Sequence, residues 1–447
     1  MVIKLSRGFD IKLLGKPEQG FLDVGSPQLY ALKPADVIGN GPIPKLHKAI
    51  GDKVLAGEPV FFDKNNPRIQ FASPVSGEVV EVRRGAKRAI DAVVISADNS
   101  VEFHNHGALD IASCSREEAV ELLLGSGAWT LLRQRPFNSL ADPEVTPRDI
   151  FVSCFDTAPL APDHNMLIEG KEAAFQAGLN VLAKLTSGSV HLGVGPGSGE
   201  VFTKAEGVKT TAFSGPHPAG NVGVQIHHIA PINKGVVVWT LKPQDVALIG
   251  KLFTDGVFDA ERTMAVTGDE LKRTGYVKTR IGASIKSIVA DNLKHESVSC
   301  ISGNALTGTK IAADGFFGLY DDQLTVLEKG DKAEFLGWLL PSYKRPSMSR
   351  TFLSFLRPNT EYHVNTSNHG EERAFVMSQQ YEKVVPMDVF PQYLIKSILF
   401  SDFEQMEGLG IYEVVEEDLA LCEFVCTSKQ PIQQILRSGL DLVRLEG

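Results

Sequence analysis

The stretch 125–138, Gly-Ser-Gly-Ala-Trp-Thr-Leu-Leu-Arg-Gln-Arg-Pro-Phe-Asn, holds residue types that could bind a ligand. Because Gly125 and Gly127 lack side chains, the backbone there could approach a phosphate group or a ring closely. The residues that follow are bulky and fill space instead of leaving room for a nucleotide. We interpret the stretch as a former nucleotide site that now suits another ligand or a partner. Its candidate contact residues are Trp129, Arg133, Arg135 and Phe137.

A second glycine-rich segment, Gly-Pro-Gly-Ser-Gly-Glu at 195–200, follows a predicted strand. The dinucleotide-binding pattern G-x-G-x-x-G would need its third glycine at position 200, where the chain has Glu200. A carboxylate there would repel a pyrophosphate, and no helical pattern opens directly after it. We predict a tight turn at this segment.

Four histidines raise the question of a metal site, because imidazole is the commonest zinc ligand. His227 and His228 are adjacent, and in a strand their side chains would point to opposite faces. His217 lies in Gly-Pro-His-Pro, which indicates a turn, and no carboxylate stands at ligand spacing. With His191, these histidines are interpreted as structural or surface residues, and no metal ligand is predicted.

Lys64 is a candidate for a covalently attached group. Segments 51–62 and 73–82 carry alternating apolar residues around glycine turns, and they resemble the two halves of a biotinyl/lipoyl-type barrel. In that family a lysine at the central hairpin carries the prosthetic group. Lys64 lies too close to the first half and precedes Asn-Asn-Pro, so we interpret it as a solvated turn residue.

The stretch 125–138 is positioned by a helix and then by an alternation of strands and helices. Ser115 and Glu118 form an S-x-x-E capping box before an apolar run, and Gly125 can end that helix. The alternation continues to about residue 255 and predicts an α/β layer. Its strands are predicted at 149–155, 189–194 and 236–239, and its helices at 166–185, broken at Gly178, and at 244–253 after Pro243.

The remaining chain shows two further patterns. After 262–268, a strand at 276–281, a short helix capped by Ser284 and a strand at 298–301 predict a small β-grasp unit. The last part has polar linkers, an apolar helix around 389–400 and a segment with two cysteines, Cys422 and Cys426.

The predicted fold class is therefore α/β and α+β multidomain. We expect an N-terminal region with the biotinyl/lipoyl-like barrel, a Rossmann-like α/β domain, a β-grasp domain and a mainly helical C-terminal domain. The predicted boundaries are 1–105, 106–255, 256–335 and 336–447.

Composition excludes several classes of protein. The chain has 447 residues, of which 43% are apolar and 22% charged, as in soluble globular proteins. A net charge of −9 and no long basic cluster argue against nucleic-acid binding. Five scattered cysteines fit a reducing compartment. No secretory leader and no stretch of ~18 apolar residues is seen, so we expect a cytoplasmic protein that reaches a membrane only through a partner.

The order of these pieces resembles the NqrA family, the peripheral A subunits of bacterial sodium-translocating NADH:quinone oxidoreductases. It is similar more distantly to RnfC and to the flavin-carrying subunit of respiratory complex I. RnfC-like proteins have Gly-Gly-Ala-Gly-Phe-Pro-Thr for flavin mononucleotide where this chain has residues 127–133. They also have two ferredoxin-type cysteine clusters, of which only Cys422 and Cys426 remain, and two thiolates cannot hold a four-iron cluster.

The resemblance implies a peripheral subunit on the cytoplasmic face of the inner membrane, within a complex that couples NADH oxidation and quinone reduction to sodium export. It implies an SLBB-like β-grasp domain, docking on NqrB beside the other Nqr subunits, and no catalysis without these partners. The complex uses NADH, flavins, an iron centre and quinone, but no cofactor is expected on this chain. Trp129 and Phe137 would stack on a quinone, and Arg133 and Arg135 would donate hydrogen bonds to a ring carbonyl.

Three alternatives stay open. In the first, the stretch 125–138 fills a vacated flavin pocket and contacts NqrB, so that the protein is a pure scaffold. A free-standing flavin- or NADH-binding dehydrogenase would need an intact phosphate loop. A biotin or lipoate carrier would need a modified Lys64.

Overall fold

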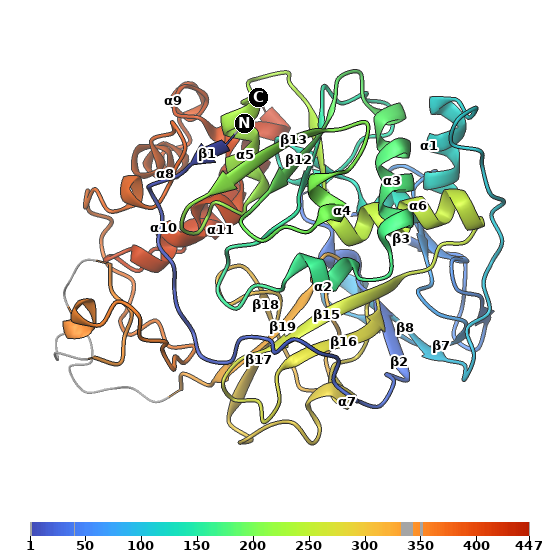
Figure 1. Ribbon diagram of the computed structural model, residues 1–447, viewed down its shortest axis with the longest axis horizontal. Helices are drawn as coiled ribbons and strands as arrows, with labels where there is room; N and C mark the ends of the chain where they lie inside the picture. The colour runs from blue at the N-terminus through green and yellow to red at the C-terminus, as the bar shows by residue number, and fades with distance from the viewer. Residues whose placement is uncertain (1, 40, 332–342, 349–351, 447) are drawn as a thin grey trace.

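Four parts of the chain meet around one centre in the computed structural model, which describes residues 2–39, 41–331, 343–348 and 352–446 (Figure 1). A large sheet with helices on its faces lies at the top of the view, and a smaller sheet lies below it. A barrel-like part lies on the right, and the C-terminal helices lie on the left. The expected alternation of architectures along the chain is therefore present.

The large sheet has seven strands in the order β1-β13-β12-β11-β14-β9-β10. From β1 to β14 the neighbouring strands are parallel, whereas β9 and β10 are antiparallel to their neighbours. The chain proceeds from β11 through β12 to β13 on one side, and then returns to β14 on the other side of β11. The topological switch point therefore lies between β11 and β14. The strands are β1 Val2–Lys4, β9 Arg133–Arg135, β10 Ser139–Leu140, β11 Ile150–Ser153, β12 Val190–Val194, β13 Lys209–Ser214 and β14 Val238–Leu241.

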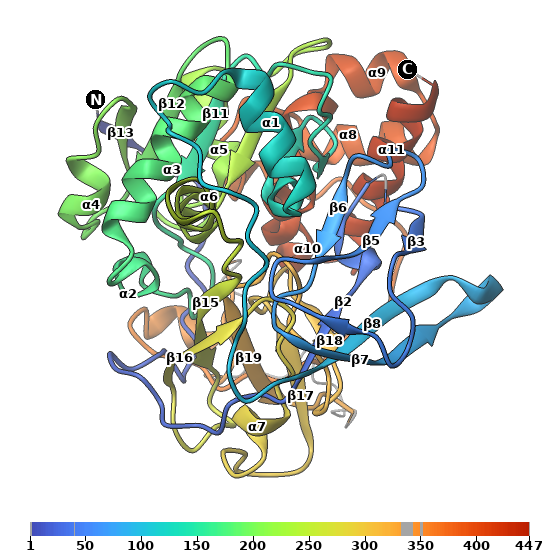
Figure 2. The ribbon, with the colours of Figure 1, turned by 90° about the vertical axis from the view of Figure 1, so that its right-hand side faces the viewer.

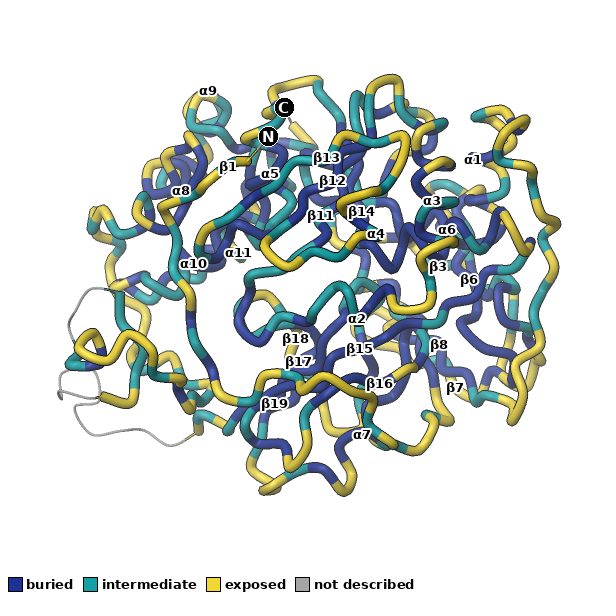
Figure 3. Tube along the Cα trace, in the orientation of Figure 1, coloured by how far each residue is buried: buried dark blue, intermediate teal, exposed yellow. Residues whose placement is uncertain are grey.

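The central strands of this sheet are buried, as the dark blue tube in Figure 3 shows. Strands β11, β12 and β14 agree with the buried strands expected from sequence, with β14 shifted by two residues. The capping box of Ser115 and Glu118 is present at the start of α1. Helices of this part are α1 Arg116–Gly125, α2 His164–Ile168, α3 Glu172–Leu185, α4 Glu200–Thr203, α5 Val222–Ile229 and α6 Pro243–Asp255.

Two sequence expectations about helices are wrong. The helix α3 runs uninterrupted through Gly178, and the break falls instead between α2 and α3. The segment at Gly195–Gly199 does contain the expected turn, but α4 begins directly after it at Glu200.

Helices α3 and α6 pack closely against each other at Gly178 and Gly250. A Cβ atom at Gly178 would lie 1.9 Å from the carbonyl oxygen of Val246, and one at Gly250 would lie 1.8 Å from that of Ala174. Glycine at both positions lets the two backbones approach closely. The glycine therefore serves helix packing and does not end the helix.

The N-terminal part consists of two small sheets that form the barrel-like body (Figure 2). Their orders are β2-β8-β7-β4 and β3-β5-β6. Lys64 is exposed in the turn that follows β5, as expected for a solvated turn residue. The strands are β2 Leu29–Leu32, β3 Pro44–Leu46, β4 Lys53–Val54, β5 Pro59–Asp63, β6 Gln70–Ala72, β7 Gly77–Arg84 and β8 Ile90–Ala97.

The smaller sheet has the order β16-β15-β19-β17-β18, with β15 and β19 parallel at its centre. This arrangement with one short helix agrees with the β-grasp expectation. Its elements are β15 Glu261–Thr267, β16 Gly275–Arg280, α7 Lys286–Val289, β17 Val298–Ser302, β18 Thr309–Ile311 and β19 Gln323–Glu328.

The C-terminal part is mainly helical where its regular elements are described. Cys422 and Cys426 are both buried, and the Tyr381 hydroxyl donates a hydrogen bond to the Cys426 thiol at 2.9 Å. The expected helix around 389–400 is present as α8. The helices are α8 Pro391–Leu399, α9 Phe403–Gly408, α10 Ala420–Val425 and α11 Ile432–Glu446.

The first strand joins the sheet of the α/β part, since β1 pairs with β13. The predicted boundary between residues 335 and 336 lies outside the described residues, and those at 105 and 255 stay predictions. In the part of the chain that the structure describes, no helix is both long and apolar enough to cross a membrane.

We expect Gly178→Ala to lower the free energy of unfolding by about 1–3 kcal/mol or more, because the added methyl group would overlap the backbone of α6. Gly125→Ala is the matched control: a Cβ there meets nothing within 4 Å, so this change should be neutral or stabilise by up to about 1 kcal/mol. Urea unfolding of both variants measures the difference. Equal effects would show that α3 and α6 are not in close backbone contact.

Candidate functional site: a cavity between the domains

A cavity of about 750 Å³ opens where the four parts of the chain meet. Its wall includes Ser153 at the carboxyl end of β11 and Leu241 at that of β14. The cavity therefore lies at the switch point of the parallel sheet, where open α/β sheets commonly bind ligands. Other walls come from the barrel, the β-grasp part and the C-terminal helices, represented by Asp36, Tyr320 and Glu417.

The charged lining of the cavity is predominantly acidic. The cavity is lined by eight carboxylate side chains and five lysine or arginine side chains. A phosphate group would meet this excess of negative charge, which weakens anion binding. The carboxylates belong to Asp36, Asp91, Asp156, Asp245, Asp321, Asp322, Glu416 and Glu417, and the cations to Lys33, Arg133, Arg135, Lys242 and Arg437.

Arg133 differs from the other four cations. Each of the others forms an ion pair with a carboxylate, but Arg133 forms none among the described residues. Its guanidinium lies over the ring of Tyr320, 5.1 Å from the ring centroid, and donates a hydrogen bond to the Asn138 side chain. Because a guanidinium has five N–H donors, Arg133 retains donors for a ligand in the cavity.

His164 is a second group in the wall with unused hydrogen-bonding capacity. It is the first residue of α2, and its Nδ1 atom is buried without a hydrogen-bond partner among the residues that the structure describes. Burial lowers the pKa of this imidazole, although the nearby carboxylates of Asp156 and Asp322 act to raise it. A neutral imidazole can donate or accept a hydrogen bond. His164 is not predicted from the sequence, because only a preceding Asp at the start of the helix marks it.

Arg262 lies behind the cavity wall, where it contacts Asp245 and Asp322, and only 1% of its surface is exposed. Its guanidinium donates to Asp322 Oδ1 at 2.8 Å and to Asp245 Oδ1. Lys242 Nζ lies 2.9 Å from the other oxygen of Asp322. Burial acts to raise the pKa of Asp322, but the charges of Lys242 and Arg262 outweigh it and lower the pKa to about 2. The sequence does not predict these ion pairs, because their members lie far apart in the chain.

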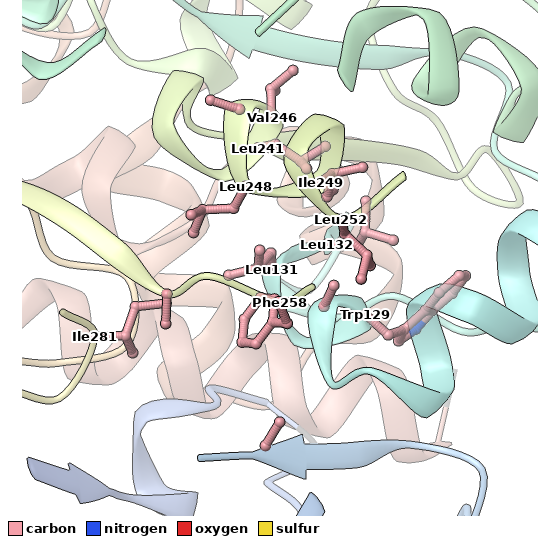
Figure 4. Close-up of a cluster of buried hydrophobic side chains, with 14 of the residues drawn as sticks. Trp129, Leu131, Leu132, Leu241, Val246, Leu248, Ile249, Leu252, Phe258 and Ile281 are labelled. Atoms are coloured by element: carbon pink, nitrogen blue, oxygen red, sulfur yellow. The ribbon is translucent and has the colours of Figure 1, made fainter. Parts of the chain in front are cut away.

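Of the predicted contact residues, Trp129 lies in the hydrophobic core (Figure 4). Its side chain is fully buried, its Nε1 donates to the carbonyl oxygen of Ala141 at 2.8 Å, and its ring meets the edge of Trp239 at 5.3 Å. Gly127 has a left-handed backbone with a φ of 81°, and a Cβ there would lie 2.8 Å from the Cβ of Ala72. This part of the stretch therefore packs against the barrel and does not line the cavity.

Arg135 and Phe137 contact the C-terminal part of the same chain. Arg135 is 2% exposed and pairs with Asp418 at 2.9 Å and Glu417 at 2.6 Å. Phe137 meets the ring of Tyr412 edge-on at 6.1 Å. The cavity thus brings Arg133 and Arg135 together, whereas Trp129 and Phe137 lie outside its wall.

The histidines singled out from sequence have protein partners. His227 and His228 lie in α5 and not in a strand, so the expectation that they point to opposite faces of a sheet is wrong. His227 Nδ1 lies 2.7 Å from Glu413, and His228 Nε2 lies 2.8 Å from the carbonyl oxygen of Pro386. His191 lies 3.3 Å from Asp149, and His217, in the cavity wall, 3.1 Å from the hydroxyl of Thr157.

Comparisons with known proteins match three parts of the chain to family models. The NqrA N-terminal barrel-sandwich hybrid domain matches residues 3–98, the NqrA second alpha/beta domain residues 114–258, and the NQRA C-terminal domain (SLBB) residues 263–313. These matches define a multidomain protein of the NqrA type, which confirms the predicted fold class.

Full-length relatives named as the A subunit of Na(+)-translocating NADH-quinone reductase include proteins from Shewanella denitrificans, Serratia proteamaculans and Vibrio atlanticus. They are 39%, 37% and 36% identical to this chain, and the alignments cover 100% of each chain. The chain therefore belongs to the NqrA family, as the sequence resemblance indicated. A chain of an NAD+-reducing NiFe hydrogenase is 11% identical over 77% of this chain and 67% of that chain, with a TM-score of 0.34.

The pKa of Asp322 predicts an acid-sensitive contribution to stability. Because the folded pKa lies below the ordinary value of 3.8, its contribution is present above about pH 4 and is lost as the pH falls towards 2. The shift corresponds to roughly 2 kcal/mol. Urea unfolding between pH 2 and 5 should therefore show a flatter pH dependence for Asp322→Asn than for the native chain.

Asp322→Asn should also be less stable at pH 7 by about 3–5 kcal/mol, because it breaks a buried ion pair. The exposed Asp98→Asn is the control and should keep the native pH dependence. An Asp322→Asn variant with the native slope would assign the acid sensitivity to another group.

Proposed function

We propose that this chain is the peripheral A subunit of a Na⁺-translocating NADH:quinone reductase, docked on the membrane subunit NqrB at the cytoplasmic face. The observation that carries the proposal is the similarity to NqrA proteins over the full length of the chain. In such a complex, NADH oxidation and quinone reduction drive sodium export, and this chain contributes binding surfaces without catalysing hydride transfer itself.

The cavity supports the proposal that this chain holds no flavin. It occupies the switch-point position at which α/β sheets bind nucleotides, yet its excess of carboxylates opposes a phosphate. Burial keeps the Cys422 thiol protonated by raising its pKa, which opposes binding of an iron cluster that requires thiolates. The NADH, flavin and iron sites of the complex are therefore proposed to lie on other subunits.

A quinone headgroup is the ligand class that fits the cavity best. It is uncharged, so the acidic wall does not repel it, and its two carbonyl oxygens accept hydrogen bonds. The Arg133 guanidinium contacts Asn138 and Tyr320 and pairs with no carboxylate in the described part of the chain, and His164 has an unpaired Nδ1 atom there. We propose that Arg133 donates to one carbonyl and that His164 lies beside it.

A pure scaffold is the second candidate, and the burial of Trp129 favours it. Stacking on a quinone would require this ring to leave the core, together with its hydrogen bond to Ala141. Arg135 and Phe137 likewise contact the chain's own C-terminal part. Under this candidate the stretch 125–138 fills the place of a flavin loop and supports docking on NqrB.

Isolation from native membranes tests the assembly. A tagged version of this chain should co-purify with NqrB and the other Nqr subunits, and should leave the membrane fraction in a strain that lacks NqrB. Immunoblots of fractions and mass spectrometry of the purified material provide the readout. If the chain stays in the membrane fraction of a strain without NqrB, the docking proposal is wrong and a direct interaction with lipid takes its place.

Substitution of Arg133 tests the quinone contact. In the assembled complex, Arg133→Ala should weaken apparent quinone affinity by about 10- to 150-fold, since a hydrogen bond to a charged group contributes about 1.5–3 kcal/mol. NADH oxidation with an artificial acceptor should be unchanged, because the hydride step belongs to another subunit. The exposed Arg84→Ala is the matched control and should leave both activities as they are.

Trp129→Ala tests whether this side chain stabilises the core and not the ligand, as its burial indicates. Removing a fully buried indole should cost about 3–5 kcal/mol and reduce assembly, while complexes that still assemble keep normal quinone kinetics. If fully assembled Arg133→Ala complexes also keep normal quinone kinetics, the quinone contact is wrong and the scaffold function remains.

A further inference from the structure

Three carboxylates and one imidazole gather where the two central strands of the β-grasp sheet, β15 and β19, end, outside the cavity wall. Asp269 and Glu270 follow the end of β15, and Glu328 is the last residue of β19. His363 comes from the C-terminal part, which contacts the end of β19 through a bridge between Glu328 and Asn365. The cluster therefore joins two parts of the chain that are distant in sequence.

The charges of this cluster do not balance. His363 Nδ1 pairs with Asp269 and lies 3.9 Å from Glu270 Oε1, while its Nε2 lies 3.1 Å from Glu328 Oε2. Among the described residues, none of the three carboxylates forms another ion pair. A protonated imidazole and the Lys294 ammonium, which donates to the backbone carbonyl of Asp269, supply two positive charges against three negative charges. The cluster therefore retains a net attraction for a cation.

The Glu270 carboxylate is buried without a hydrogen-bond donor from the described residues. Its side chain is 8% exposed, and its carboxylate accepts no hydrogen bond from the residues that the structure describes. Asp269 Oδ1 beside it is also buried without a hydrogen-bond partner from these residues. Buried carboxylates are normally paired or bound to a metal, because their desolvation is costly. Both carboxylates offer donor atoms that lie within 4.8 Å of one another and of a nitrogen of His363.

We propose that Asp269, Glu270 and His363 form a binding site for a divalent cation, with Zn²⁺ as the ion of best fit. Imidazole nitrogen and carboxylate oxygen are both donor types that zinc accepts, whereas Mg²⁺ and Ca²⁺ prefer oxygen alone. Zinc holds its ligands about 2 Å away. The direct contact between His363 and Asp269 must therefore open to admit the ion, and Glu270 must move closer, which the half-exposed His363 side chain can accommodate.

The bound ion ties the C-terminal part to the β-grasp sheet. Asp269 and Glu270 supply ligands from one side and His363 from the other, so occupancy opposes separation of the two. Glu328 lies next to the imidazole and orients it through Nε2. This site is independent of the quinone cavity and does not rest on the proposed function.

Calorimetric titration of the purified full chain with ZnCl₂ tests the site. We expect one Zn²⁺ per chain, and an affinity at least about tenfold lower in His363→Ala and in Glu270→Gln. Zn²⁺ should raise the unfolding temperature of the native chain but of neither variant. His47→Ala, which removes another exposed imidazole on the barrel, is the control and should bind as the native chain does.

Circular dichroism without metal establishes that both variants are folded, and Glu270→Gln retains the shape of the side chain if His363→Ala loses stability. Absence of saturable Zn²⁺ binding to the native chain overturns the proposal. Binding that keeps its affinity in both variants overturns it as well, because the ion would then lie elsewhere.

Discussion

The junction between the large sheet and the β-grasp sheet depends on the buried ion pairs of the Arg262 guanidinium. A charge this deeply buried requires partners, and they are Asp245 on α6 and Asp322 directly before β19. Lys242 then pairs with the same Asp322, so the end of β14 is held as well. Loss of either carboxylate would leave a buried charge uncompensated. The floor of the cavity is consequently fixed by electrostatics together with apolar packing.

Arg135 has the same role towards the C-terminal part, through Asp418 and Glu417. This use of Arg135 changes how the stretch 125–138 is understood. The stretch contains two arginines that look equivalent in sequence, but one stabilises the fold and the other faces the cavity without a carboxylate partner among the described residues. Burial and pairing separate their roles, and neither property is visible in the order of residues.

Local signals in the sequence predicted the elements that local physics determines. The capping box at Ser115 and the proline that begins α6 satisfy the helix ends by themselves, so both were found. Gly178 was misjudged because its helix is stabilised by a neighbour 68 residues further on, Val246, that no local pattern reveals. His164 and the partners of Arg262 were missed for the same reason: they acquire their environments only when distant segments pack together.

The cavity shows why topology and charge must be considered together. Position at a switch point follows from strand order alone, and it survives when the residues around it change. Affinity for a phosphate depends on backbone N–H groups and positive charge. Here the backbone at Gly127 packs against Ala72, and carboxylates outnumber cations in the cavity wall. A ligand that binds there must therefore gain its free energy from hydrogen bonds and apolar contact instead of from anionic charge. That requirement makes Arg133 the decisive side chain, since it is the cavity cation whose charge no carboxylate in the described part of the chain neutralises.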